Sequence, residues 1–255
     1  MNRGLAPQGG TGSRRHALVD ALDRRLGGPL RRQRRRQLLG RYLRPGALAL
    51  DVGANVGEWT AAARELGARV VAVEPHPACL ETLRQRYGAE PAVVLEALAI
   101  ADHVGHAQLH LGTTSAVSTL SDAFRRAYGS GGYGPATVGW TSALAVETTT
   151  LDVLIARHGK PTLTKLDVEG FERTALAGLH TSLPAICFEY NERLRDEAIA
   201  CIERVEQLGP MRWNFTAWEG WRLAHRRWLP GAEIARWVAA LPPSVLTGDL
   251  WAEAP

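Results

Sequence analysis

The chain has 255 residues, of which 45% are hydrophobic and 22% charged, with a formal net charge of +4. This balance is typical of a globular protein with one substantial core, so we expect one domain rather than two. No apolar run approaches the roughly 18 residues that would cross a bilayer, which excludes an integral membrane protein.

Targeting signals and cysteines narrow the class further. The N-terminal segment lacks the apolar h-region of a secretory signal, so we expect a cytoplasmic protein. Cys79, Cys187 and Cys201 are an odd number, are widely spaced and form no C-x-x-C pair, so they indicate neither a disulfide framework nor a zinc site. Cys187 lies in an apolar run and is interpreted as a small buried hydrophobic residue.

The first 45 residues form a predicted basic extension, distinct from a domain over residues 46–255. Residues 1–46 hold twelve arginines and only two aspartates, a local net charge of +10 that leaves −6 on the remainder. Residues 1–13 are predicted to be disordered, and the arginine-rich stretch to about Tyr42, with leucines at i+4 spacing, to be a solvated surface helix. RNA, an anionic membrane surface or an acidic substrate are alternative roles for this charge. Base stacking needs interleaved aromatic residues, and Tyr42 is the only one here, so nucleic acid is disfavoured.

Beyond Pro45 and Gly46, short apolar runs alternate with helical patterns, which is typical of a parallel sheet covered by helices. We therefore predict an α/β fold with a mostly parallel sheet. In the first half of the domain, the predicted strands are 47–52, 69–73 and 92–98, and the predicted helices, ended by Gly67 and Gly88, are 58–66 and 78–87.

After Asp102 the pattern changes, because residues 106–111 and 145–149 alternate with period two and predict an antiparallel insertion. A Gly-rich loop at residues 128–135 lies between them. The aromatic residues beside it are candidates for a lid or for a mobile linker: Tyr128, Tyr133 and Trp140. The remaining predicted helices are 151–158, 171–179 and 194–208, and the remaining predicted strands are 163–167, 185–190, 211–218 and, as an edge strand, 248–252.

Six of the eight tryptophans fall in the last 45 residues, at positions 213, 218, 221, 228, 237 and 251. Aromatic faces there are candidates to stack on an acceptor. Because tryptophan carries a large apolar area, packing in the core is the favoured interpretation.

The first polar cluster runs off strand 47–52 into a helix, from Asp51 to Gly57. Ligands of open parallel sheets bind at such strand ends. Gly53 permits a tight turn, Gly57 permits close approach, and the unpaired N–H groups of the helix start favour a carboxylate. This suits the amino-acid end of S-adenosylmethionine. Asp51 would accept a hydrogen bond from its ammonium group, directly or through water.

A dinucleotide is the alternative ligand for this turn. Its G-x-G-x-x-G pattern would need glycine where Asn55 and Glu58 stand, and Glu58 would bring negative charge beside the phosphates, which disfavours NAD. Glu74 ends the next strand, 23 positions beyond Asp51, about where an acid accepts both hydroxyls of a ribose. The two signals together predict a nucleoside pocket.

Acidic residues also follow strand 163–167. Asp167 and Glu169 are predicted to face one side, while Glu172 enters the next helix, where the helix dipole alone explains an acid. Methyl transfer requires an acceptor oxygen held at about 3 Å from the reacting carbon and a group that takes its proton. Asp167 and Glu169 are the predicted catalytic pair.

Strand 185–190 ends in Glu189 and Asn191, which are candidates to join Asp167 as oxygen ligands of Mg²⁺. No histidine is evidently involved. Magnesium is therefore a secondary hypothesis.

The segments "LDVGANVGEWT", "VVAVEPHP", "EALAIAD", "TTTLDVLIARHG", "LTKLDVEGFERTALAGL" and "CFEYN", from about residue 46 to 191, resemble the FkbM family of methyltransferases in order and spacing. The resemblance implies a Rossmann-like class I methyltransferase fold, S-adenosylmethionine as donor, and O-methylation of a sugar, polyketide or similar metabolite. By position, the residues it implies for the cofactor are Asp51, Gly53, Ala54, Asn55, Gly57, Glu74, Pro75 and, on the adenine side, Ala99 and Asp102. Asp167 and Glu169 match its acidic pair near the transfer site. His76 stands where asparagine is common, and the first 45 residues and the Gly-rich loop lie outside the resemblance.

The resulting hypothesis is an S-adenosylmethionine-dependent O-methyltransferase with a small-molecule or glycan acceptor. An RNA-directed methyltransferase that uses the basic extension, and a non-catalytic protein that binds S-adenosylmethionine, are the alternatives.

Overall fold

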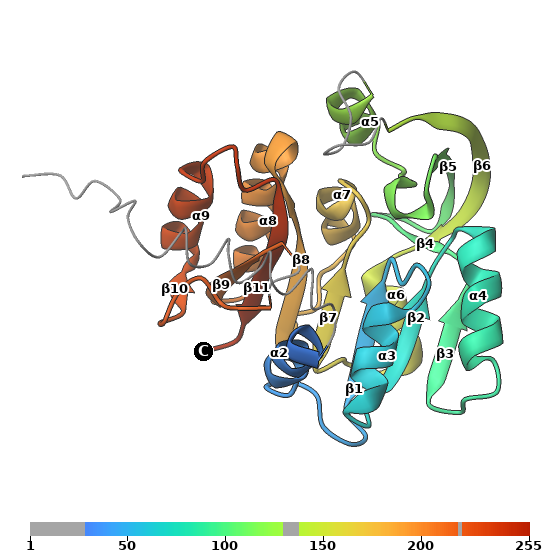
Figure 1. Cartoon of the computed structure of the whole chain (residues 1–255), viewed down its shortest axis with the longest axis horizontal. Coiled ribbons are helices and arrows are strands. Elements are labelled where there is room, and N and C mark those ends of the chain that lie inside the picture. The colour runs from blue at the N-terminus through green and yellow to red at the C-terminus, as the bar shows by residue number, and fades with distance from the viewer. Residues whose placement is uncertain (1–28, 130–137, 219–220) are drawn as a thin grey trace, which may run out of the picture.

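An eight-stranded sheet runs through the part of the chain that the computed structural model describes, residues 29–129, 138–218 and 221–255 (Figure 1). Its strand order is β10-β9-β11-β8-β7-β1-β2-β3. In chain order these strands are β1 (Leu48–Val52), β2 (Arg69–Val73), β3 (Val93–Glu96), β7 (Leu163–Leu166), β8 (Ala185–Asn191), β9 (Arg212–Ala217), β10 (Leu229–Pro230) and β11 (Thr247–Glu253).

The strands β3, β2, β1, β7 and β8 are parallel, which confirms the predicted α/β fold. After β1 the chain adds β2 and β3 on one side, and β7 then pairs with the other side of β1. The carboxyl ends of β1 and β7 therefore form a topological switch point, where open α/β sheets bind ligands.

The last strand corrects one prediction. Residues 248–252 were expected at a sheet edge, which is wrong, because β11 lies between β8 and β9 and is antiparallel to both. Leu250 and Trp251, on opposite faces of β11, are 0% and 1% exposed. An apolar pattern indicates that a strand is buried, but neither this pattern nor the strand's position in the chain shows where in the sheet the strand lies.

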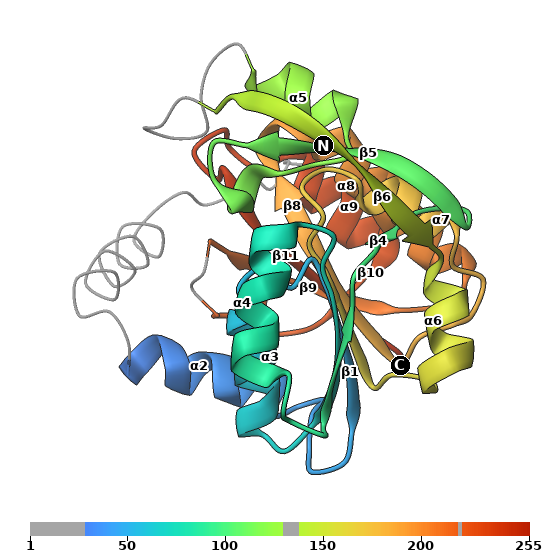
Figure 2. The same cartoon turned by 90° about the vertical axis from the view of Figure 1, so that its right-hand side faces the viewer.

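Helices cover both faces of the sheet (Figure 2). One face carries α2 (Pro29–Leu39), α3 (Glu58–Glu65) and α4 (Pro77–Tyr87). The other carries α6 (Leu151–His158), α7 (Glu172–Ala177), α8 (Arg195–Gln207) and α9 (Gly231–Ala239). Strand β1 serves both cores, with Leu48 and Leu50 in one and Ala49 in the other, as alternate residues of a strand must. The sequence patterns predicted neither α9 nor β10.

A second sheet forms the insertion, with strand order β4 (Ala99–Ile100), β6 (Trp140–Thr149) and β5 (Gly105–Gly112). Strands β5 and β6 are antiparallel, as predicted. The predicted strand 92–98 ends earlier than expected, as β3 at Glu96, because the chain leaves the central sheet at residues 97–98, and β4 of the second sheet begins at Ala99.

The insertion also contains the short 3-10 helix η1 (Ser115–Val117) and α5 (Asp122–Tyr128), which the sequence did not predict. Tyr128 ends α5 and packs on Phe124, with the ring centroids 4.7 Å apart. Trp140 packs on the same ring at 6.2 Å and donates to the Val117 carbonyl. These two lid candidates thus belong to a small core, and Tyr133 lies outside the described residues.

The described part of the basic extension packs on the domain. Three leucines around its end are at most 5% exposed: Leu38, Leu39 and Leu43. Arg32 pairs with Glu65 of α3 at 2.9 Å, and Arg41 pairs with Glu253 of β11 at 3.1 Å. These arginines hold α2 against the fold, while residues 1–28 lie outside the described residues.

The core contains several of the residues for which burial was expected. Trp213 and Trp251 are fully buried, which confirms core packing for these two, whereas Trp218 is 37% exposed. Cys187 is buried as predicted, and Cys79 and Cys201 are also buried free thiols. In the described ranges, no helix is long and apolar enough to cross a membrane.

Candidate active site

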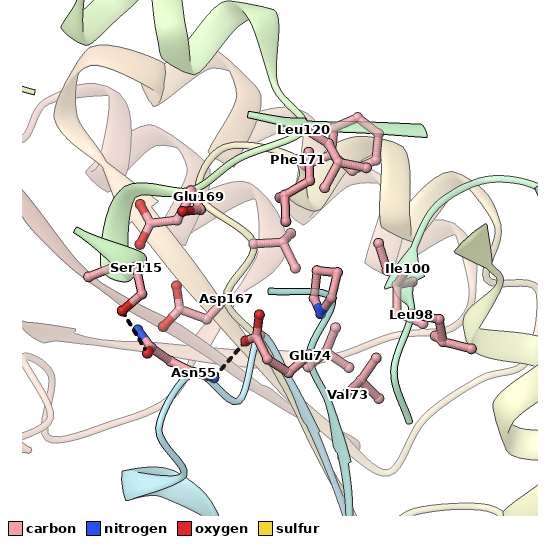
Figure 3. Close-up of a pocket in the computed structure, with 18 residues that line it drawn as sticks. Asn55, Val73, Glu74, Leu98, Ile100, Ser115, Leu120, Asp167, Glu169 and Phe171 are labelled. Carbon is pink, nitrogen blue, oxygen red and sulfur yellow. Dashed lines mark hydrogen bonds between the residues drawn. The ribbon is translucent and has the colours of Figure 1, made fainter. Parts of the chain in front are cut away.

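A cavity opens at the switch point, beside the carboxyl ends of β1, β2 and β7 (Figure 3). Its volume is about 180 Å³. One buried water needs only about 10–15 Å³, so the cavity has the size of a ligand site rather than of a packing defect. Seven predicted site residues line it: Gly53, Asn55, Glu74, Pro75, Ala99, Asp167 and Glu169.

Glu74 is held at the cavity by two backbone amides. It is 6% exposed, its Oε2 accepts from the Asn55 N–H at 2.7 Å, and its Oε1 accepts from the His76 N–H at 2.8 Å. Burial raises the pKa of Glu74 to about 7, although both amide hydrogen bonds act in the opposite direction. Each carboxylate oxygen still has a second lone pair, so the pair of hydroxyls on a ribose would complete the set and favour the charged form.

The turn after β1 requires glycine at two places. Gly53 has φ +79°, and a Cβ there would lie 1.7 Å from the backbone oxygen of Asp167. Gly57 has φ +82°, and a Cβ there would lie 2.7 Å from the side chains of Leu83 and Tyr87. The close approach at Gly53 therefore joins β1 to β7, and the one at Gly57 joins the turn to α4.

Three predicted cofactor residues besides Gly57 do not line the cavity. Asp51 is 1% exposed, its Oδ2 accepts from Thr60 Oγ1 at 2.5 Å, and burial raises its pKa to about 6 despite that hydrogen bond. Ala54 is buried beside it in the turn, and Asp102 is exposed, 2.7 Å from the His103 ring. Asp51 thus supports the start of α3 from behind the cavity wall.

Apolar side chains form the wall opposite these polar groups. Figure 3 shows Leu98 and Ile100 on one side of the cavity, and Asn55, Asp167 and Glu169 on the other. A planar base fits such a wall, and the polar side fits the ribose and the charged end of a nucleoside ligand.

The insertion supplies part of the cavity that no sequence signal had marked. Ser115 of η1 donates to Asn55 Oδ1 at 3.1 Å, and Asn55 itself is left-handed, with φ +48°. Leu109 and Leu120 of the insertion also line the cavity. Their positions follow from how the second sheet folds over the first, so local patterns could not have identified them.

The acidic region lies at the ends of β7, β8 and β11, and we use this name for Lys165, Asp167, Glu169, Glu172, Glu189 and Asp249. Lys165 is 5% exposed, and its Nζ lies 2.9 Å from Asp167 Oδ2 and 3.3 Å from Asp249 Oδ1. The pKa of Lys165 lies well above its ordinary value, because the charges of Asp167 and Asp249 outweigh the opposing effect of its burial. One ammonium is thus shared by two carboxylates.

Glu169 enters the cavity through a left-handed turn. Strand β7 ends at Leu166, Glu169 has φ +52°, and Thr119 Oγ1 donates to its carbonyl at 2.8 Å. Its side chain and that of Asp167 both line the cavity, but this turn, rather than the strand period, directs Glu169 there. Burial first, and then the charges of Glu189 and Asp167, raise the pKa of Glu169 well above its usual range.

Three carboxylates come close enough to share a cation: Asp167, Glu172 and Glu189, with one oxygen of each within 4.8 Å of the others. Glu172 Oε1 accepts from the Val168 N–H at 2.9 Å, and burial raises its pKa to about 7. Asn191, predicted as a third ligand, instead accepts from the Arg193 N–H at 3.4 Å. The third member of this group is therefore Glu172 rather than Asn191, although the sequence had explained Glu172 by the helix dipole alone.

Comparison with known proteins gives one family match and a set of similar solved structures. The family model of the methyltransferase FkbM domain matches residues 51–208. Similar solved structures include a TehB-like SAM-dependent methyltransferase from Corynebacterium glutamicum, with 12% identity, 95% of this chain and 98% of that chain covered, and a TM-score of 0.45. A precorrin-6y C5,15-methyltransferase from Geobacter metallireducens shares 11% identity over 86% of this chain and 88% of that chain, with a TM-score of 0.40. An rRNA methylase from Streptococcus thermophilus shares 12% identity over 86% of this chain and 92% of that chain, with a TM-score of 0.42.

No curated protein matches the chain significantly. The family match covers more than half of the sequence, from the end of β1 through α8, and includes the cavity turn, Glu74 and the acids after β7. The chain therefore belongs to the FkbM family of S-adenosylmethionine-dependent methyltransferases.

Proposed function

We propose that this methyltransferase methylates a hydroxyl oxygen of an uncharged, polyhydroxylated acceptor such as a sugar, a glycan or a secondary metabolite, and that Glu169 removes the hydroxyl proton. The observation that carries this proposal is that Glu169 lines the same cavity as Asn55 and Glu74 while lying among other carboxylates. The proposal thus places a base next to the methyl donor.

The cavity residues divide the work of holding the cofactor. Glu74 accepts the ribose hydroxyls through its remaining lone pairs, and Leu98, Ala99 and Ile100 pack on the adenine. Asp167, beside Gly53, faces the methionine end. When bound, the cofactor supplies an electrophilic methyl group on a sulfonium sulfur.

Glu169 acts on the acceptor. In the transfer the acceptor oxygen forms a bond to the methyl carbon, the carbon–sulfur bond breaks, and the hydroxyl proton moves to a Glu169 carboxylate oxygen. Burial and the neighbouring carboxylates raise the pKa of Glu169 well above its ordinary value, which makes its carboxylate a stronger base for the hydroxyl proton.

The charge of the acidic region selects the class of acceptor. Asp167, Glu169 and Glu189 offer hydrogen-bond acceptors to hydroxyl donors, and the one cation of the acidic region, Lys165, is already shared by Asp167 and Asp249, so this region offers no partner to a phosphate or carboxylate group. A neutral polyol therefore fits better than a phosphorylated sugar or an RNA backbone. The described arginines Arg32 and Arg41 are paired with acids of the chain itself, so they give no support to an RNA substrate.

Methyl transfer to a panel of acceptors tests the proposal. S-adenosylhomocysteine formation would be measured with neutral sugars and polyols, with their phosphates, and with RNA, using wild type and Glu169→Gln. We expect transfer to a neutral hydroxyl compound, with kcat lowered about 10²- to 10⁴-fold in Glu169→Gln and little change in KM for the cofactor. The matched control is Glu203→Gln on the exposed side of α8. Full activity of Glu169→Gln would reject Glu169 as the base, and transfer only to RNA or phosphates would reject the acceptor class.

A further inference from the structure

Lys165 and Asp249 belong to the acidic region but have no role in the proposed function. Only two of the 30 Lys and Arg residues are lysines, Lys160 and Lys165, so a lysine is unusual in this chain. Lys165 is 5% exposed, and a buried ammonium is stable only with charged partners. It lies between the carboxylates of Asp167 and Asp249. A compact ammonium fits there, whereas a planar guanidinium requires a wider site.

Asp249 is itself fixed by strands at the C-terminal side of the sheet. Its Oδ2 accepts from Thr216 Oγ1 at 3.4 Å, and Thr216 Oγ1 accepts from the Trp251 indole N–H at 3.1 Å. Trp251 is 1% exposed, so its ring is locked by the core. These polar contacts therefore lead from a buried indole through Asp249 to Lys165. Thr216 of β9 and Asp249 and Trp251 of β11 all lie beyond the family-matched segment, 51–208.

Asp167 has one carboxylate oxygen that accepts a hydrogen bond and one that has no partner among the described residues. Lys165 donates to Oδ2, while Oδ1 is shielded from solvent and has no hydrogen-bond partner among the described residues. The backbone of Asp167 presses against Gly53, at the base of the turn where the amino-acid end of the cofactor is expected. Asp51, the residue expected to receive the ammonium, is turned to Thr60 behind the wall. Among the described carboxylates, Asp167 is thus the one beside Gly53 with a shielded, unpartnered oxygen.

We propose that Lys165 and Asp249 are positioning residues that hold Asp167 by Oδ2, so that Oδ1 accepts a hydrogen bond from the ammonium of the cofactor's methionine moiety. This inference rests on the proposed cofactor cavity. A charge-assisted hydrogen bond of this kind is about twice as strong as a neutral one, and its strength depends on the orientation of the carboxylate. Because Lys165 fixes the orientation of the Asp167 carboxylate, it acts on ligand binding without touching the ligand.

Two ligands separate this role from a general structural one. S-adenosylhomocysteine carries the ammonium, and 5′-methylthioadenosine has the same nucleoside and thioether without the amino-acid group. Isothermal titration would measure both affinities for wild type, Lys165→Met, Asp249→Asn and the exposed control Lys160→Met. We expect Lys165→Met to weaken S-adenosylhomocysteine about 10- to 100-fold and 5′-methylthioadenosine less than about twofold. Asp249→Asn should give a smaller loss with the same selectivity, and Lys160→Met should change neither affinity.

Coupling to Asp167 completes the test. Asp167→Asn alone should reproduce the selective loss, and Lys165→Met added to it should cost no further affinity, because Lys165 acts through Asp167. Equal weakening of both ligands in Lys165→Met, or additive losses in the double variant, would overturn the proposal. If Lys165→Met does not fold, the nearly isosteric Asp249→Asn decides, and an unchanged S-adenosylhomocysteine affinity there overturns it. Wild type that binds neither ligand would instead refute the cofactor cavity itself, so the two failures are distinct.

Discussion

The two regions that meet at the cavity are held together in different ways. The first, which we call the nucleoside region (Gly53, Asn55 and Glu74), comes from one short β-α-β stretch, and its acid is fixed by backbone amides. The acidic region draws residues from positions 165 to 249, and its contacts join charged side chains. Backbone contacts in a β-α-β unit depend on local chain geometry, whereas buried charges depend on every strand that brings a partner. A substitution should therefore act narrowly in the first region and spread through the second.

The largest effect is expected where the two regions touch. Gly53→Ala would place a Cβ 1.7 Å from the backbone oxygen of Asp167, and no side-chain rotation relieves a clash with backbone. The free energy of unfolding, measured by urea denaturation, should fall by more than about 3 kcal/mol. Gly46→Ala is the matched control, because Gly46 has φ +81° but nothing within 4 Å of a Cβ, and it should cost only about 1–2 kcal/mol. If the two substitutions lowered the free energy of unfolding equally, the close backbone contact between Gly53 and Asp167 would be refuted.

The acidic region should impose a pH dependence on stability. The pKa of Glu172 is raised from 4.5 to about 7 by burial, so the folded state holds its proton more tightly than the unfolded state. Its contribution to stability is therefore present below about pH 4.5 and is lost as the pH rises through about 7. Glu172→Gln, which mimics the protonated form, should be more stable than wild type by about 3 kcal/mol at pH 8 and equal to it at pH 4. Denaturant midpoints at both pH values measure this, with exposed Glu203→Gln as the control, and a stabilisation that is the same at both would contradict it.

The nucleoside region should respond in ligand binding without selectivity for the amino-acid end. Glu74→Gln keeps the shape but loses an acceptor that serves Asn55, His76 and the ribose. S-adenosylhomocysteine and 5′-methylthioadenosine should both weaken about tenfold by isothermal titration. If Glu74→Gln lost affinity for S-adenosylhomocysteine alone, Glu74 would contact the methionine end, and the expected difference from Lys165→Met would be absent.

The smallest effect is expected from metal removal. Lys165 already provides a cation to the carboxylate of Asp167, and the proposed proton transfer requires only Glu169. Methyl transfer should therefore proceed at an unchanged rate after treatment with EDTA. Lost activity that Mg²⁺ restores would assign the group of Asp167, Glu172 and Glu189 to a metal, which prefers such oxygen ligands.

Local sequence was sufficient for much of the nucleoside region. The apolar strands, the turn with Gly53 and the acid at Glu74 each follow from patterns within a few residues, and the parallel sheet then brings their carboxyl ends together. Asp167 and Glu169 were also recognised, as acids that follow a buried strand. Lys165 was not recognised; the rarity of lysine in the chain could have marked it, but could not have identified Asp167 and Asp249 as its partners.

Sequence alone therefore determined the α/β class, the chain order of the central elements, the family resemblance and seven of the 18 residues that line the cavity. Only the tertiary structure decided that β11 lies inside the sheet, that the insertion forms a cavity wall, that Asp51 turns away, and that Asp249 reaches Lys165. The physical reason is range. Strand periods, turns and caps arise between near neighbours in the chain, whereas sheet neighbours and buried charge pairs form between distant segments and are chosen by the packing of the whole fold.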